Sequence, residues 1–163
     1  MLNYKHMLAA AGLIAFAATQ SMAALSKADQ DFAQKAAAGG LAEVALGQLA
    51  QQNGNSPDVK NFGQKMATDH AQANQELQQI AQQENLKLPA QPASKDISRF
   101  SNLKGAAFDS AYMKDMVRDH QQDVADFQKE AQSGQDPALK AFAGKYLPTL
   151  QEHLQMAQAM NKK

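Results

Sequence analysis

Residues 56–65 read SPDVKNFGQK and residues 136–145 read DPALKAFAGK, so one pattern recurs 80 positions further along the chain. Each copy starts with a small polar residue followed by proline, which is typical of a helix start because the first helical N–H has no partner to lose. The same offset aligns Asp29 with Asp109 without a gap. The repeat therefore predicts two similar helical hairpins in one chain.

Four segments carry apolar residues at the spacing of one helix face. Their predicted limits are Lys27 to Gln52, Pro57 to Asn85, Ala106 to Gln132 and Pro137 to Met160. Only four residues separate the first two segments, and only four separate the last two. Such short loops make the neighbouring helices antiparallel.

The middle connection, residues 86–105, is much longer and contains Pro89, Pro92 and a short amphipathic turn over 94–103. About 20 residues can travel the length of a bundle, as in helical bundles with one long crossover. The sequence therefore predicts an all-α fold, a ferritin-like four-helix bundle with one long crossover between the second and third helices.

Residues 1–23 have the features of a cleavable signal peptide. Lys5 precedes an apolar run of about a dozen residues, and Ser21-Met22-Ala23 supplies the small residues that a signal peptidase reads. That run is shorter than the roughly 20 residues that a membrane-spanning helix needs. We therefore expect export to the periplasm, no integral membrane association after cleavage, and a single domain over residues 24–163.

Charge and composition narrow the function further. The chain has 16 basic and 16 acidic residues and no cysteine, and loss of Lys5 with the signal peptide leaves a net charge of −1. This balance argues against nucleic acid as a partner, because nucleic acid selects basic surfaces. The chain has no glycine-rich phosphate loop and no nucleophile motif, so the sequence favours a non-enzymatic protein and leaves its partners unknown.

Five polar residues stand out near the middle of the predicted helices. Four occupy positions where the helix period calls for an apolar residue, one per helix, and the fifth lies one turn beyond the third. They are Glu43, His70, His120, His153 and Asp123. Counted from the linking loops at ~1.5 Å per residue, they spread over about 10 Å along the bundle, compact enough for one polar layer but too broad for all five to hold one ion.

Two interpretations of this layer remain open. Imidazole and carboxylate groups from facing helices suit a divalent metal such as zinc, iron or copper. Alternatively, the same groups form a buried hydrogen-bond network that fixes helix register. The Glu-x-x-His spacing of di-iron bundles is absent, since Ala67, Val117 and Leu150 precede the three histidines by three positions. The spacing thus favours the network, with no cofactor, over the metal site.

A family resemblance covers essentially the whole chain after the signal peptide. Its motifs occur in order: DQDF (29–32), GGLAEV (39–44), PDVKNFG (57–63), MATDH (66–70), LP (88–89), FDSAY (108–112), MVRDH (116–120) and LPTLQEHL (147–154). The chain resembles the domain-of-unknown-function family 4142. The resemblance implies an exported bacterial protein with a ferritin-like helical fold, in a family often labelled as outer membrane proteins and without an assigned activity.

Residues and resemblance together give two functional hypotheses. The first is a non-enzymatic periplasmic protein that acts as a binding module or in envelope stress. The alternative is a periplasmic metal-binding protein that uses the Glu/His layer in the bundle core.

Overall fold

A computed structural model describes residues 24–162. The predicted signal peptide, residues 1–23, lies outside this range. The described residues form five α-helices and no strand, which confirms the all-α prediction. The helices are α1 (Lys27–Asn53), α2 (Pro57–Gln83), α3 (Ser94–Ser101), α4 (Gly105–Ser133) and α5 (Pro137–Asn161).

The four long helices begin and end within two residues of their predicted limits, because the local signals are strong. Ser26 and Ser56 cap α1 and α2 by accepting a backbone N–H at their side-chain oxygens. Asp136 does the same for α5, where it accepts from the N–H of Leu139 at 2.8 Å. Proline occupies the first turn of both α2 and α5.

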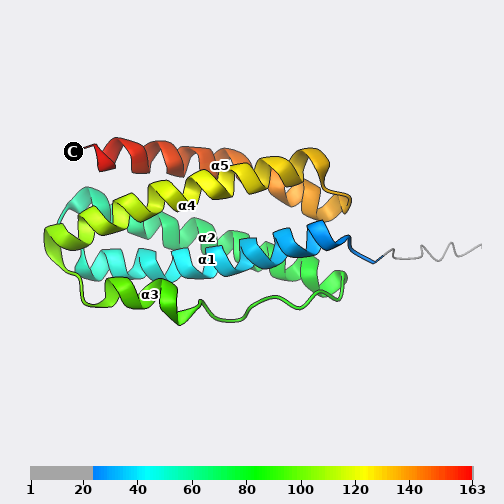
Figure 1. The fold of residues 1–163 in the computed structure, drawn as a ribbon, viewed down its shortest axis with the longest axis horizontal. Coiled ribbons are helices and arrows are strands. Elements are labelled where there is room, and N and C mark those ends of the chain that lie inside the picture. The colour runs from blue at the N-terminus through cyan, green and yellow to red at the C-terminus, as the bar shows by residue number, and fades with distance from the viewer. Residues whose placement is uncertain (1–23, 163) are drawn as a thin grey trace, which may run out of the picture.

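The long helices pack as two hairpins. α1 lies against α2 and α4 against α5, while the lighter contacts α1–α4 and α2–α5 join the hairpins. A parallel bridge between Gly54 and Gly105 brings the start of α2 to the start of α4, so these two helices run in the same direction. The chain between them returns along the side of the hairpins and includes α3 (Figure 1).

Each hairpin holds the loop of the other. Asp109 on α4 accepts the backbone N–H groups of Asn55 and Ser56 at 2.9 and 2.8 Å. Asp29 on α1 accepts the N–H groups of Gln135 and Asp136 at 3.1 and 3.2 Å. All three pairs of equivalent residues are 80 positions apart, so the structure supports the two-hairpin repeat predicted from the sequence.

The apolar core consists of two clusters at opposite ends of the bundle. The first cluster is built around Phe62, Met66, Phe108 and Tyr112, and the second around Phe32, Leu77, Phe127 and Phe142. Between α1 and α2 the backbones approach closely, since a Cβ atom at Gly47 would lie 2.4 Å from the carbonyl oxygen of Gly63. No helix among the described residues is long and apolar enough to cross a membrane.

Candidate metal centre

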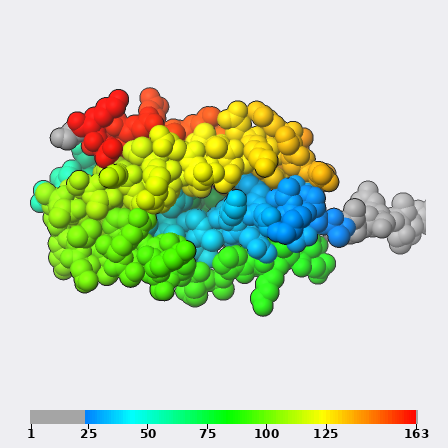
Figure 2. Space-filling view, viewed as in Figure 1, coloured from blue at the N-terminus to red at the C-terminus, as the bar shows by residue number. Residues whose placement is uncertain are grey.

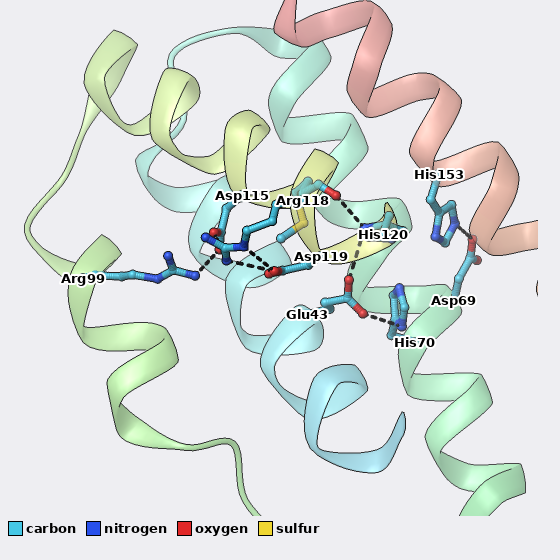
Figure 3. A network of polar contacts seen from close by, with 10 residues as sticks. Glu43, Asp69, His70, Arg99, Asp115, Arg118, Asp119, His120 and His153 are labelled. Atoms are coloured by element: carbon cyan, nitrogen blue, oxygen red, sulfur yellow. Dashed lines mark hydrogen bonds and ion pairs between the residues drawn. The ribbon is translucent and has the colours of Figure 1, made fainter. Parts of the chain in front are cut away.

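Each long helix sends one polar side chain into the middle of the bundle, between the two apolar clusters (Figure 3). Glu43 comes from α1, His70 from α2, His120 from α4 and His153 from α5. All four are buried, and the two histidines of the second hairpin have no exposed surface. We call these four residues the polar layer.

The three imidazole rings form a nearly equilateral triangle. Their centroids are 5.6 Å apart for His70 and His120, 5.5 Å for His70 and His153, and 5.4 Å for His120 and His153. One ring nitrogen from each histidine lies within 4.8 Å of the other two. Three potential nitrogen ligands therefore converge on one point.

The partner of His120 fixes which of its nitrogens carries a proton. Nδ1 lies 3.0 Å from the carbonyl oxygen of Met116, and because a carbonyl only accepts, Nδ1 must donate. Nε2 then holds the lone pair, and no group of the protein partners it. His120 is thus oriented by its own helix, with its lone pair available to a ligand.

Asp69 orients His153 in the same manner. Its Oδ2 lies 2.8 Å from Nε2 of His153. Burial opposes ionisation of Asp69, but hydrogen bonds from His153 and Lys65 outweigh it and lower its pKa, so this carboxylate accepts. Nδ1 of His153, which is buried without a partner, therefore carries the lone pair. A carboxylate behind an imidazole is the usual support of a metal-binding histidine.

Glu43 lies between two of the rings. Its Oε2 is 2.9 Å from Nδ1 of His70 and its Oε1 is 3.3 Å from Nδ1 of His120, yet neither oxygen accepts a well-aligned hydrogen bond. Burial raises the pKa of Glu43 to about 7, against the opposing influence of His120. Its place on the Nδ1 side of both rings makes it a supporting group for the two histidines.

Burial also decides the charge of the histidines. It lowers the pKa of His70 to about 4 and that of His153 to about 3, and it lowers the pKa of His120. The cause is the cost of placing a positive charge in a site shielded from water. At neutral pH all three rings are therefore uncharged, which is the form that binds metals.

Unpartnered polar atoms are concentrated in the polar layer. Among the described residues, seven buried side-chain nitrogen or oxygen atoms lack a hydrogen-bond partner, and five of them belong to Glu43 and the three histidines. A buried polar atom without a partner costs about 1–3 kcal/mol, so such a concentration needs a physical explanation. A cavity of about 20 Å³ beside His70 and His153 has room for about one water-sized occupant.

Asp123, the fifth residue predicted from the sequence, lines this cavity together with Glu43, His70 and His153. It is not part of the group of converging ring nitrogens. Burial and the charge of Glu43 raise its pKa well above the ordinary value. The structure therefore brings Asp123 to the edge of the polar layer.

Asp69 was not among the predicted site residues. The sequence contained a signal, the repeated Asp-His pair, but adjacent residues on a helix point about 100° apart. Asp69 for that reason faces α5 and His153, while His70 faces the other histidines (Figure 3). Only the packing of α2 against α5 reveals this contact.

Fold and site together define an all-helical protein with a buried histidine layer. The chain belongs to the family described as Domain of unknown function (DUF4142), whose family model matches residues 15–160. No curated protein matches the sequence. Among solved structures, the chain is similar to "CopM in the Cu(II)-bound form", with 13% sequence identity and a TM-score of 0.65 over 82% of this chain and 95% of that one.

Proposed function

We propose that this protein is a non-enzymatic metal-binding protein of the bacterial periplasm. In this proposal the mature chain, residues 24–163, is a single ferritin-like four-helix bundle. Its histidines His70, His120 and His153 hold one divalent transition-metal ion. Metal binding in the cell envelope would also connect the two hypotheses drawn from the sequence, a binding or envelope-stress protein and a metal-binding protein. A protein that binds metal would act when metal ions stress the envelope.

The observation that carries this proposal is a group of three buried histidines whose ring nitrogens come within 4.8 Å of one another, each histidine having one nitrogen without a hydrogen-bond partner. The unpartnered nitrogens are Nε2 of His70, Nε2 of His120 and Nδ1 of His153. A structural hydrogen-bond network would pair such atoms with one another or with neighbouring groups. Instead, the protein partners the opposite nitrogen of His120 and of His153 with a fixed acceptor, which is the arrangement expected of metal ligands.

The donor set suits zinc, copper or iron. Three imidazoles with a nearby carboxylate favour borderline divalent ions, and among these Cu²⁺ binds most tightly to a given set of nitrogen and oxygen ligands. Nitrogens bound to one such ion at about 2.0–2.1 Å can be at most about 4.2 Å apart, so small ring rotations complete the site. The fold shared with copper-bound CopM adds a reason to test Cu²⁺ first.

The absence of Glu-x-x-His from the chain argues against a di-iron oxidase. Carboxylates from four helices would be needed for that chemistry, whereas here the polar layer contains one glutamate and three histidines. Binding without catalysis is therefore the simpler function for this site.

Thermal melts with and without metal test the proposal. A ligand that binds only the folded state stabilises it by about 4 kcal/mol at 1,000 times its dissociation constant, which corresponds to a Tm increase on the order of 10 °C for a domain of this size. We expect Cu²⁺ or Zn²⁺ to raise the Tm of the untagged mature protein, and EDTA to reverse the increase. The protein must carry no histidine affinity tag, because a tag binds the same metal ions. Without one, all histidines beyond residue 23 belong to the polar layer.

Two variants make this test specific. His120→Ala should lose most of the metal-dependent increase in Tm. Leu139→Ala removes a buried residue of the second cluster and should lower the Tm of the apo protein, yet it should keep the full increase with metal. If wild-type protein shows no metal-dependent change in Tm, the layer is a structural network and the proposed function is wrong.

A further inference from the structure

A cleft between α1, α3 and α4 leads from the surface to the polar layer. It has a volume of about 240 Å³ and is lined by residues of all three helices, with Glu43 among them. Figure 2 shows the hollow between the blue-to-cyan surface of α1, the green surface of α3 and the yellow-green surface of α4. The cleft is thus a second cavity that touches the proposed metal site.

Glu43 connects the cleft with the histidines. The residue is only 3% exposed, its oxygens have no hydrogen-bond partner, and they lie 2.9 and 3.3 Å from Nδ1 of His70 and His120. A buried carboxylate thus lines the cleft and contacts two of the three rings. A cation that reaches the Glu43 carboxylate is therefore adjacent to the proposed metal site.

The walls of the cleft favour cations. Asp96, Asp119 and Asp123 line it in addition to Glu43. Its two basic residues, Arg99 and Arg118, both form ion pairs with the buried Asp115, and Arg118 also pairs with Asp119 (Figure 3). The acidic groups in excess are therefore Glu43, Asp96 and Asp123. A cleft lined by one sign of charge raises the local concentration of ions of the opposite sign.

The opposite side of the polar layer is less suited to the passage of a metal ion. There the ammonium group of Lys65 lies 3.1 Å from Asp69 and 3.5 Å from Glu152, so a positive charge stands in front of the carboxylate that supports His153. The cavity of about 20 Å³ beside His70 and His153 has room for about one water-sized occupant, whereas the cleft has a volume of about 240 Å³.

We propose that the metal ion reaches the polar layer through this cleft, meets Asp119 and Asp123 first, and passes by Glu43 to His70 and His120. This inference rests on the proposed function and adds to it the route of the ion. The route predicts that bulk and charge in the cleft control the rate of binding. It also predicts that bulk has little influence on affinity, because a steric barrier slows association and dissociation alike.

Gly39 offers a way to narrow the cleft. It lines the cleft, and a Cβ atom at this position would meet nothing within 4 Å, so the backbone accepts a side chain here without a clash at Cβ. Gly39→Phe places a ring near the mouth, and the ion must then wait for a conformational change, which lowers the association rate constant on the order of tenfold or more. Gly39→Ala is the matched control and should bind at nearly the wild-type rate.

Charge gives a second, independent pair of variants. Asp119→Asn removes a carboxylate from the cleft, whereas Glu152→Gln removes an exposed one from the opposite side. We expect Asp119→Asn to slow association about two- to fivefold at low ionic strength, and the difference to fade near 1 M salt, where charges are screened within about 3 Å. Glu152→Gln should leave the rate unchanged.

Both pairs are measured by stopped-flow quenching of tyrosine fluorescence with glycine-buffered Cu²⁺, beside equilibrium titration of the same proteins. If Gly39→Phe binds Cu²⁺ at the wild-type rate, the proposed route is wrong, although the proposed metal binding is not affected. A greater loss in Glu152→Gln than in Asp119→Asn does the same. If wild-type protein binds no Cu²⁺ at equilibrium, the proposed function fails, and the route fails with it.

Discussion

The hairpin α1–α2 and the hairpin α4–α5 are alike at their ends and different at their middles. At the ends, Asp29 and Asp109 occupy equivalent positions, and each binds the loop of the other hairpin. At the middle, Glu43 corresponds to Asp123 in the 80-residue offset. In contrast, no histidine of the layer has a histidine at the equivalent position. Gly40, Ala73 and Leu150 stand opposite His120, His153 and His70.

This difference separates two kinds of physical demand. Docking of two similar hairpins is reciprocal, so the same anchor is needed twice. A single site between the hairpins needs each donor only once. Gly40, the position equivalent to His120, meets a different packing demand, because a Cβ atom there would lie 2.3 Å from Oδ1 of Asn74. The two hairpins are therefore similar where they dock, whereas the histidine layer between them is not repeated.

The largest expected effect tests whether the two apolar clusters contribute equally to the free energy of unfolding. Phe62 and Phe142 are equivalent in the repeat, and they are 1% and 2% exposed in separate clusters. Phe62→Ala and Phe142→Ala should each lower the free energy of unfolding by about 3–5 kcal/mol through the cavity that remains. Urea denaturation measures both. A cost below about 1 kcal/mol in one variant would show that the two clusters are not equivalent.

A smaller effect is expected at the two loop anchors. Asp29→Ala should cost about 2–3 kcal/mol and Asp109→Ala about 1–2 kcal/mol, because each loses two charge-assisted hydrogen bonds and Asp29 is the more deeply buried. Asp31→Ala is the control, since this exposed residue pairs only with Lys27 on the surface and should change stability little. Equal, small costs in all three variants would contradict the anchoring role.

The smallest effect concerns a group present in one hairpin only. Glu130 is buried beside Asp29, whereas its equivalent in the first hairpin is Ala50. Burial, together with the charge of Asp29, raises the pKa of Glu130 to about 7. Above pH 4.5 the unfolded chain loses this proton while the folded protein keeps it, so this contribution to stability is lost as pH rises through 7.

Glu130→Gln keeps the shape of the side chain and removes the titration. Relative to wild type, the variant should therefore gain stability between pH 5 and pH 8, on the order of 1 kcal/mol. The difference between the two proteins isolates Glu130 from the histidines, whose lowered pKa values act in the opposite direction between about pH 3 and 6.5. A difference that does not change with pH would show that Glu130 ionises normally in the folded protein.

Local signals account for most of what the sequence predicted correctly. Ser56 and Pro57 start a helix by their own chemistry, and a loop of three residues forces its two helices to be antiparallel, whatever the rest of the chain does. The polar layer was also visible, since one polar residue per apolar stripe at similar height predicts that the four meet. These inferences need only the helix period and the rise per residue.

The remaining contacts depend on how the helices rotate about their axes. The sequence could not show that Asp69 supports His153, or that Glu43 lies on the Nδ1 side of two rings. Both facts follow from which faces of α1, α2 and α5 meet, and a rotation of a few tens of degrees would change them. The pairing of Asp29 with Asp109 was visible as a repeat, but the hydrogen bonds of each to the opposite loop follow only from docking.

The reciprocal anchors also have a consequence for the order of folding. Helix pairs joined by short loops can form from local contacts, whereas the hydrogen bonds of Asp29 span more than a hundred residues of chain. These bonds do not exist within an isolated hairpin, and they close only when the long connection has brought the second hairpin into place. The anchors therefore depend on docking of the two hairpins, and the same docking brings His70 together with His120 and His153.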